Sequence, residues 1–300
     1  MSLESDPYQK QNNDQDKAWL YEISAKRKFI DLNLKEIWRY RDLLILFVKR
    51  DITTVYKQTV LGPLWFFIQP LFTSVIFTLI FNNIASISTG IIPAFLFNLA
   101  GVTAWSYFKE SLTGTSSTFR TNASIFGKVY FPRVIVPLSK VISNLVKFAI
   151  QMLILIGFYI YYAKFAGASI RPGMYLLLLP VYVLLMAIYG LGLGMLISTL
   201  TTKYRDLSLL MTFVIQLLMY VSAVPYPMSL FKEKAPEYSW VVEYNPLAHI
   251  IEGFRYSLFA TDTLQFNWES LITTSVIGIV IFFIGLAFFN RTEKTFIDTV

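Results

Sequence analysis

The alternation of apolar and polar positions divides the chain into a polar start, an amphipathic segment and a series of long apolar runs. Residues 1–32 are predominantly polar. From residue 35 to 57, apolar residues such as Ile37, Leu44 and Ile52 recur at helical spacing between charged residues. No charged residue occurs from 58 to 108, which is enough chain for two membrane crossings of about 20 residues each.

Further apolar runs follow, and together they predict six membrane-spanning helices. The runs cover about 64–84, 93 onward, 141–163, 174–200, 207–224 and 270–290. Between the last two runs, residues 225–268 are too polar to span, and Asn245-Pro246 is a favourable helix start. We therefore predict an all-α integral membrane protein with a six-span domain over 63–290, short re-entrant or gate helices between spans five and six, and a polar tail over 291–300.

The junction between the amphipathic segment and the first run contains Gly62 and Pro63. Glycine relaxes the backbone and proline removes a hydrogen-bond donor, so this pair predicts an elbow between two helices. The segment 33–62 is basic and amphipathic, which favours a helix on the cytoplasmic membrane surface. The alternative is an ordinary surface helix of a soluble subdomain.

Composition supports the membrane interpretation. Hydrophobic residues make up 55% of the 300 residues and charged residues 15%, compared with about 25% charged in an average soluble domain. The net charge of +7 does not indicate nucleic acid, because the basic residues flank apolar runs. The absence of cysteine excludes disulfides and thiolate metal sites. The polar N-terminus predicts no cleavable signal peptide.

The distribution of cations predicts the orientation. Of the 26 lysines and arginines, 19 fall in residues 1–60, 119–140, 201–208 and 291–300. The segments on the other side hold Lys164, Arg171, Lys232, Lys234 and Arg255. Cytoplasmic loops carry the excess of positive charge, so both termini are expected in the cytoplasm.

The chain lacks the chemistry of a motor or an enzyme. No GxxxxGK[ST] phosphate-binding loop occurs. The single histidine, His249, is more typical of an interface than of a metal site or a catalytic base. Lys109 and Glu110 lie toward the inner end of the second span, where charges indicate function or reach the membrane surface. We predict no catalytic residue, no metal and no cofactor, and hence a passive conduit that needs an external motor.

Aromatic residues are the positive signal for a translocation path. Aromatic rings offer flat apolar surfaces, and Tyr and Trp add a polar edge, which suits sugar rings. The alternative for each ring is lipid contact or the interfacial belt. The predicted channel and gate residues are Trp65, Phe66, Phe67, Phe72, Trp105, Tyr107, Phe108, Phe213, Tyr220 and Tyr226.

Four segments resemble a known family. YKQTVLGPLWFFIQP (56–70), KVYFPRVIVPLS (128–139), YRD (204–206) and NPLAHIIEGFR (245–255) are similar to the permease subunit of ABC-2 type polysaccharide exporters, which export O-antigen, teichoic acid and capsular polymers. The resemblance extends over about 33–290 and implies a homodimer in the bacterial cytoplasmic membrane. It also implies two copies of a separate ATPase subunit, which binds ATP and magnesium.

The same resemblance implies roles for particular segments. A coupling loop over 120–140, with a coupling helix at 125–137, would contact the ATPase through Tyr130, Phe131 and Arg133. Arg205 and Asp206 would form a second contact. The segment 225–268 would be the outer gate. A lipid-linked polysaccharide would enter from the inner leaflet near the elbow.

Three other functions are considered. An ABC-2 permease for another amphiphile, such as teichoic acid, a lipid or a drug, would have the same architecture. An integral-membrane transferase would need an acid or base at a membrane face, and only Glu110, Glu252 and His249 offer one. A structural membrane scaffold would need neither a gate segment nor a coupling loop.

Overall fold

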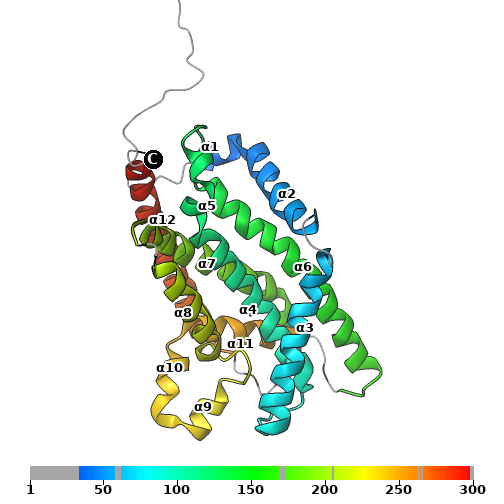
Figure 1. Ribbon diagram of the computed structural model, residues 1–300. Coiled ribbons are helices and arrows are strands. Elements are labelled where there is room, and N and C mark those ends of the chain that lie inside the picture. Colours follow the sequence, from blue (N-terminus) through cyan, green and yellow to red (C-terminus); the bar gives the residue numbers. More distant parts are fainter. Residues whose placement is uncertain are drawn as a thin grey trace, which may run out of the picture.

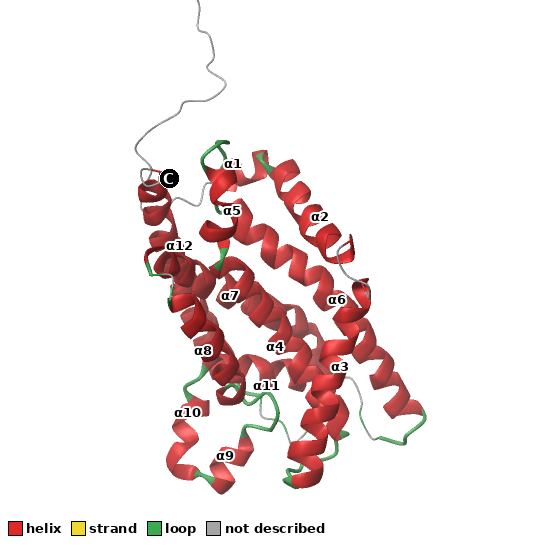
Figure 2. Ribbon diagram, in the orientation of Figure 1, coloured by secondary structure: helices red, strands yellow, loops and turns green. Residues whose placement is uncertain are grey.

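The computed structural model describes residues 34–57, 62–168, 170, 173–204, 206–261, 264 and 266–297. Within these ranges every regular element is a helix and no strand occurs (Figure 2). The all-α prediction is therefore confirmed. The polar tail predicted over residues 1–32 lies outside the described residues.

Two surface helices, α1 (Leu34–Arg39) and α2 (Arg41–Lys57), occupy the amphipathic segment. They lie at the same end of the bundle as the C-terminal end of α12 (Trp268–Ile297) (Figure 1). Helix α2 packs against α6 (Ile135–Lys164), and the ring of Phe47 meets that of Phe131 at 5.8 Å. Trp38 remains 70% exposed. An exposed tryptophan among cations is typical of a helix on a membrane surface.

The elbow adopts a conformation that favours glycine. Gly62 has φ of +49°, and a single 3-10 turn over Gly62–Leu64 leads into α3 (Trp65–Phe77). Pro70 lies inside α3, where a kink is expected. The last part of this span, Thr78–Ile84, is a π-helix.

The core is built around α4 (Ala94–Ser116) and α7 (Leu179–Lys203). Small residues allow these helices to approach closely. A Cβ atom on Gly194 would lie 2.5 Å from the Cβ of Thr115 on α4, and one on Gly190 would lie 2.8 Å from that of Ser111. The opposite face of α7 contacts α12 (Trp268–Ile297), because Gly192 lies against the backbone of Phe282.

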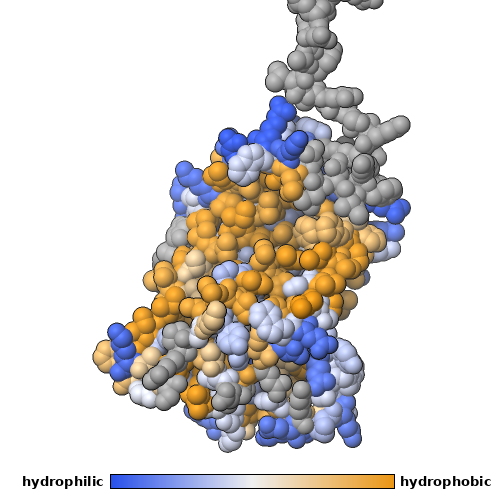
Figure 3. Space-filling model, turned by 180° about the vertical axis from the view of Figure 1, so that it is seen from behind, coloured by the Kyte–Doolittle hydropathy of each residue, from blue (hydrophilic) through white to orange (hydrophobic). Residues whose placement is uncertain are grey.

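Among the described residues, four helices are long and apolar enough to cross a membrane. They are Trp65–Ile84, Ile135–Lys164, Met174–Lys203 and Trp268–Glu293. The other two predicted spans correspond to α4, a largely buried helix, and to α8 (Leu207–Val221), which has 15 residues. Figure 3 shows an apolar band across the back of the molecule, with hydrophilic residues above and below it. This surface matches an integral membrane protein.

The segment between α8 and α12 is a chain of short helices. It contains α9 (Ser229–Lys234), a 3-10 turn (Pro236–Tyr238), α10 (Ser239–Glu243) and α11 (Pro246–Phe259). The predicted start of α11 is confirmed, because the Asn245 side chain accepts a hydrogen bond from the Leu247 amide at 3.0 Å. The apolar stripe of α11 is buried in the core.

The polar segment predicted after the sixth span begins as helix. Helix α12 continues beyond the apolar run to Ile297. Glu293, in this extension, accepts contacts from the buried Arg133. A polar composition therefore marks the end of the apolar run but not the end of the helix.

Candidate functional site

A cleft of about 500 Å³ opens on the face where α3 and α8 flank α4 (Figure 1). Its floor is α4, one wall is α3, and the other wall combines α8 with the end of α7. Most of its polar lining residues carry hydroxyl or amide groups: Gln69, Thr73, Ser106, Thr113, Ser116, Ser117, Thr201, Ser208, Thr212 and Gln216. Such groups suit water or a hydroxyl-rich ligand rather than lipid chains.

The floor of the cleft is a polar stripe along α4 and into α5 (Thr118–Phe126). Ser106, Lys109, Thr113, Ser116 and Arg120 follow one another at intervals of three or four residues, and all line the cleft. This spacing places them on one face of a helix. The other faces of α4 are packed in the core. The stripe is therefore the part of the most buried helix that remains open.

Lys109 and Glu110 are adjacent in sequence but face different grooves. Lys109 lines the cleft, and no carboxylate of the described residues lies within ion-pair distance of it. Glu110 turns toward α6, where its carboxylate lies 2.9 Å from the Nζ of Lys147. The two adjacent intramembrane charges are therefore separate features.

The second groove, of about 420 Å³, lies between α3, α4 and α6. Its lining includes Trp65, Phe66, Glu110, Lys140 and Lys147. The Nζ of Lys147 lies 5.5 Å from the centre of the Phe66 ring, within the range of a cation–π contact. The predicted gate residues next to the elbow thus lie beside a charged groove.

The predicted aromatic residues have diverse surroundings. Trp105 lines the cleft although it is 3% exposed. Tyr107 and Phe108 are packed in the core, with the Tyr107 ring 5.1 Å from that of Phe148. Phe72 and Phe213 are more than half exposed, Phe67 is half-buried, and Tyr220 is 39% exposed on α8. Within the described protomer, the polar stripe contributes more to the cleft than the rings do.

Tyr226 lies beyond α8, in the segment 225–268, which was predicted to be the outer gate and is here called the outer segment. Its hydroxyl donates to the carbonyl oxygen of Tyr220, and its ring meets that of Phe231 at 5.6 Å. Burial raises the pKa of Tyr226 to about 12, so the hydroxyl keeps its proton and its hydrogen bond at neutral pH. This contact ties the outer segment to the end of α8.

The hydroxyl and amide residues of the cleft were missed at the level of sequence. The sequence pattern pointed to aromatic rings, whereas 12 of the 19 residues that line the cleft are polar or charged and only Trp105 is aromatic. A signal was present in the sequence, because Ser106, Lys109, Thr113 and Ser116 recur at helical spacing within an otherwise apolar run.

The predicted coupling segment has a different structure from the one expected. The expected coupling helix covers 125–137, whereas α5 ends at Phe126, residues 127–134 form turns and a loop, and α6 begins at Ile135. Pro137 is in the first turn of α6, a position that proline tolerates. The loop 127–134 therefore joins two helices at the end of the bundle near α1 and α2.

The three predicted contact residues of this loop differ in exposure. Tyr130 is 60% exposed. Phe131 is 3% exposed and packs on Phe47. Arg133 is 5% exposed and donates to the carbonyl oxygen of Glu293 at 3.1 Å. Arg133 and Phe131 thus hold the loop against α12 and α2 from inside, and Tyr130 is the one that is presented outward.

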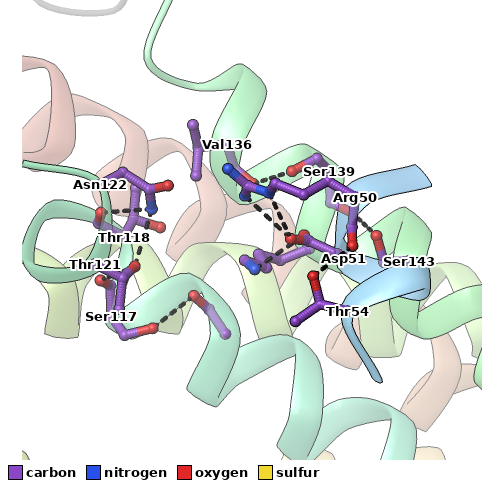
Figure 4. Close-up of polar contacts among 12 residues, drawn as sticks. Arg50, Asp51, Thr54, Ser117, Thr118, Thr121, Asn122, Val136, Ser139 and Ser143 are labelled. Atoms are coloured by element: carbon purple, nitrogen blue, oxygen red, sulfur yellow. Dashed lines mark hydrogen bonds and ion pairs between the residues drawn. The ribbon is translucent and has the colours of Figure 1, made fainter. Parts of the chain in front are cut away.

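The surface helix α2 is fixed to the same region by ion pairs. The carboxylate of Asp51 lies 3.0 Å from Arg50 and 2.9 Å from the Nζ of Lys140 on α6. Figure 4 shows Arg50 and Asp51 beside Ser139 and Ser143 of α6. The second predicted contact is described only in part: Arg205 lies outside the described residues, and Asp206 directly precedes α8.

The described residues contain no group of three His, Asp or Glu side chains that could hold a metal ion. The Nε2 of His249 lies 2.7 Å from the carbonyl oxygen of Glu243, and Glu252 is buried beside Arg255. Both contacts lie within the segment between α8 and α12.

Comparison with known proteins identifies the family. The family model described as "ABC-2 type transporter" matches residues 42–259. The chain is 30% identical over 259 residues to an O-antigen export system permease protein RfbA of Klebsiella pneumoniae, covering 86% of this chain and 94% of that protein. It is 24% identical over 267 residues to a protein of the same name from Myxococcus xanthus, covering 89% and 98%. The chain belongs to the ABC-2 type transporter family.

Proposed function

We propose that this chain is the membrane subunit of an exporter that moves a lipid-linked, O-antigen-type polysaccharide across the bacterial cytoplasmic membrane. The relatives are named O-antigen export system permease proteins. The observation that carries the proposal is the polar cleft on α4. Hydroxyl and amide groups at the depth of apolar spans are stable only when they face protein, water or a polar ligand.

The open side of the cleft supports a homodimer. The polar lining between α3 and α8 faces outward from the single chain. A second copy on this face would shield the lining from lipid and enclose a path between the two copies. We infer six spans per copy, with α4 and α8 crossing the membrane inside this assembly. The outer segment from α9 to α11 would then close the path on the far side.

The energy must come from another subunit, because the sequence has no phosphate-binding loop. We infer two copies of a separate ATPase, which binds ATP and magnesium and contacts the loop 127–134 around Tyr130. The proposed orientation places both ends of the chain on the cytoplasmic side, together with α1 and α2. The distribution of lysine and arginine predicts this orientation.

The test is complementation in an O-antigen-producing bacterium that lacks its own permease. Cells that express this chain with the ATPase encoded beside it should regain surface polysaccharide, measured with an antibody on intact cells. The chain without the ATPase should not restore it. Export without any ATPase, or modification of the polymer by the isolated chain, would contradict the proposal.

A permease for another amphiphile is the second candidate. The cleft has apolar lining residues, which a drug or a simple lipid could also use, but it adds ten residues with hydroxyl or amide groups, which such a ligand does not need. The lining therefore favours a polymer that carries hydroxyl groups along its whole length.

A further inference from the structure

Lys109 differs from the other cations packed between the helices. Each of these other cations forms an ion pair with a carboxylate: Lys147 with Glu110, Lys140 with Asp51, Arg133 with Glu293 and Arg255 with Glu252. Lys109 is half-buried in the cleft and has no such partner among the described residues. A cation among apolar spans is normally compensated by an anion.

Extension to the membrane surface does not explain this lysine. Lys109 is seven residues from the end of α4 at Ser116, which corresponds to about 10 Å along a helix. In a helix the Cα–Cβ bond tilts toward the N-terminus. In the proposed orientation the side chain of Lys109 therefore leans away from the cytoplasm and deeper into the cleft.

The surroundings of Lys109 add polarity but no negative charge. The cleft is lined by hydroxyl and amide groups, by Lys109 and by Arg120, and no aspartate or glutamate of the described residues lines it. Arg120 lies at the same end of the cleft as Ser208, to whose hydroxyl it donates at 3.4 Å. Two cations without a carboxylate make this cleft attractive to anions.

We propose that Lys109, assisted by Arg120, binds an anionic group of the passing substrate, a phosphate or a carboxylate. This proposal rests on the proposed function and refines its substrate class. Binding of a neutral glycan needs only the hydroxyl and amide groups of the cleft, whereas a positively charged site favours a substrate with negative charge. The anion could belong to the phosphate of the lipid anchor or to an acidic sugar.

The experiment measures binding to the purified full chain in nanodiscs of zwitterionic lipid. The fluorescent probes are a polyprenyl diphosphate, the corresponding uncharged polyprenol and an oligogalacturonate, which carries carboxylates on sugars. The variants are Lys109→Gln, Lys109→Arg and, as a matched control, Lys164→Gln, which removes an exposed lysine at the far end of α6.

We expect the unaltered chain to bind at least one anionic probe more tightly than the polyprenol, and binding should weaken as salt is raised. Lys109→Gln should weaken that binding about tenfold, as for the loss of one charge-assisted hydrogen bond. Lys109→Arg and Lys164→Gln should retain it. Preference for the diphosphate would assign the anion to the lipid anchor, and preference for the oligogalacturonate would assign it to the sugars.

Equal binding of charged and uncharged probes, or salt-independent binding, would overturn the proposal even if Lys109→Gln does not fold. So would a fall in the dimer fraction of Lys109→Gln, because Lys109 would then pair with a carboxylate of a second copy. Complementation separates the two proposals: restored export without anion binding contradicts this inference alone, whereas anion binding without restored export contradicts the proposed function.

Discussion

At the scale of single residues, close packing depends on positions without a side chain. Gly190 and Gly194 contact Ser111 and Thr115 of α4, and Gly192 contacts α12. The GxxxG spacing in the sequence permits such a contact, and the structure shows which helix makes it. Gly157 on α6 has the opposite environment, because a Cβ atom there would meet nothing within 4 Å.

Gly194→Ala should therefore destabilise the protein, and Gly157→Ala should not. The added methyl group would lie 2.5 Å from the Cβ of Thr115, so α4 and α7 must separate. We expect a loss of about 1–3 kcal/mol in the free energy of unfolding. Thermal unfolding of both variants in detergent measures it, and equal stability would show that the crossing is not tight.

The buried Arg255 is a second residue with a large structural effect. Its guanidinium donates to the carbonyl oxygens of Phe97, Ala223 and Val224, and it lies 3.7 Å from the centre of the Phe97 ring. One side chain thus joins α11 to α4 and to the end of α8. The sequence shows this residue only as a cation in an outer segment.

Arg255→Met should loosen the outer segment. The change leaves Glu252 without this cation and removes the donor that Arg255 supplies to three carbonyl groups, so we expect a loss of about 3–5 kcal/mol. Limited proteolysis should then cut between α8 and α11 faster than in the unaltered protein. Lys234→Met, at an exposed position on α9, is the control, and equal cleavage of both variants would refute the assignment.

At the scale of elements, α6 is held to its neighbours by charge as well as by apolar contact. Glu110 on α4 pairs with Lys147, and Asp51 on α2 pairs with Lys140. Both lysines project from one helix to two different partners. The register of α2 and α4 against α6 is thus defined by two ion pairs at 2.9 Å.

Exchange of the Glu110–Lys147 pair tests whether its role is structural. Glu110→Lys should lower the free energy of unfolding by about 1.5 kcal/mol or more, because two like charges then face each other. Adding Lys147→Glu should restore stability and export, measured by thermal unfolding and by surface polysaccharide. If the exchanged protein is stable but inactive, Glu110 has a chemical role that the ion pair does not explain.

At the scale of the whole molecule, the loop 127–134 and helices α1, α2 and α5 gather at one end of the bundle (Figure 1). Three residues of this loop were predicted to contact a partner, and Tyr130 is the exposed one. The buried Phe131 and Arg133 fix the backbone beneath it. In the proposed orientation, this end would therefore present a supported surface to the ATPase subunit.

Tyr130→Ala should reduce the amount of ATPase that copurifies with the chain, without lowering the stability of the membrane domain. Tyr238→Ala is a matched control, because Tyr238 is equally exposed, at 60%, but lies in the outer segment. The ATPase-to-permease ratio after affinity purification measures the effect. An unchanged ratio for Tyr130→Ala would remove this loop from the predicted contact.

The sequence predicted elements better than it predicted sites. Apolar runs located the long helices, and Asn245 located the start of α11, because both signals are local. The cleft could not be located by counting aromatic residues, since a ring such as Tyr107 packs equally well in a core. The burial of Arg133 and Arg255 depends on residues more than 30 positions away, and no local pattern encodes such contacts.

In the proposed dimer, the glycine contacts of α7 also bear on how wide the path between the two copies can become. Helices α4, α7 and α12 meet backbone to backbone, so their separation is fixed. By contrast, α8 has a single buried residue, Ile215, and α3 has three. Outward displacement of α3 and α8, with α4, α7 and α12 held in place, would then make room for a bulky sugar branch. Polymers of different width could therefore pass along the same path.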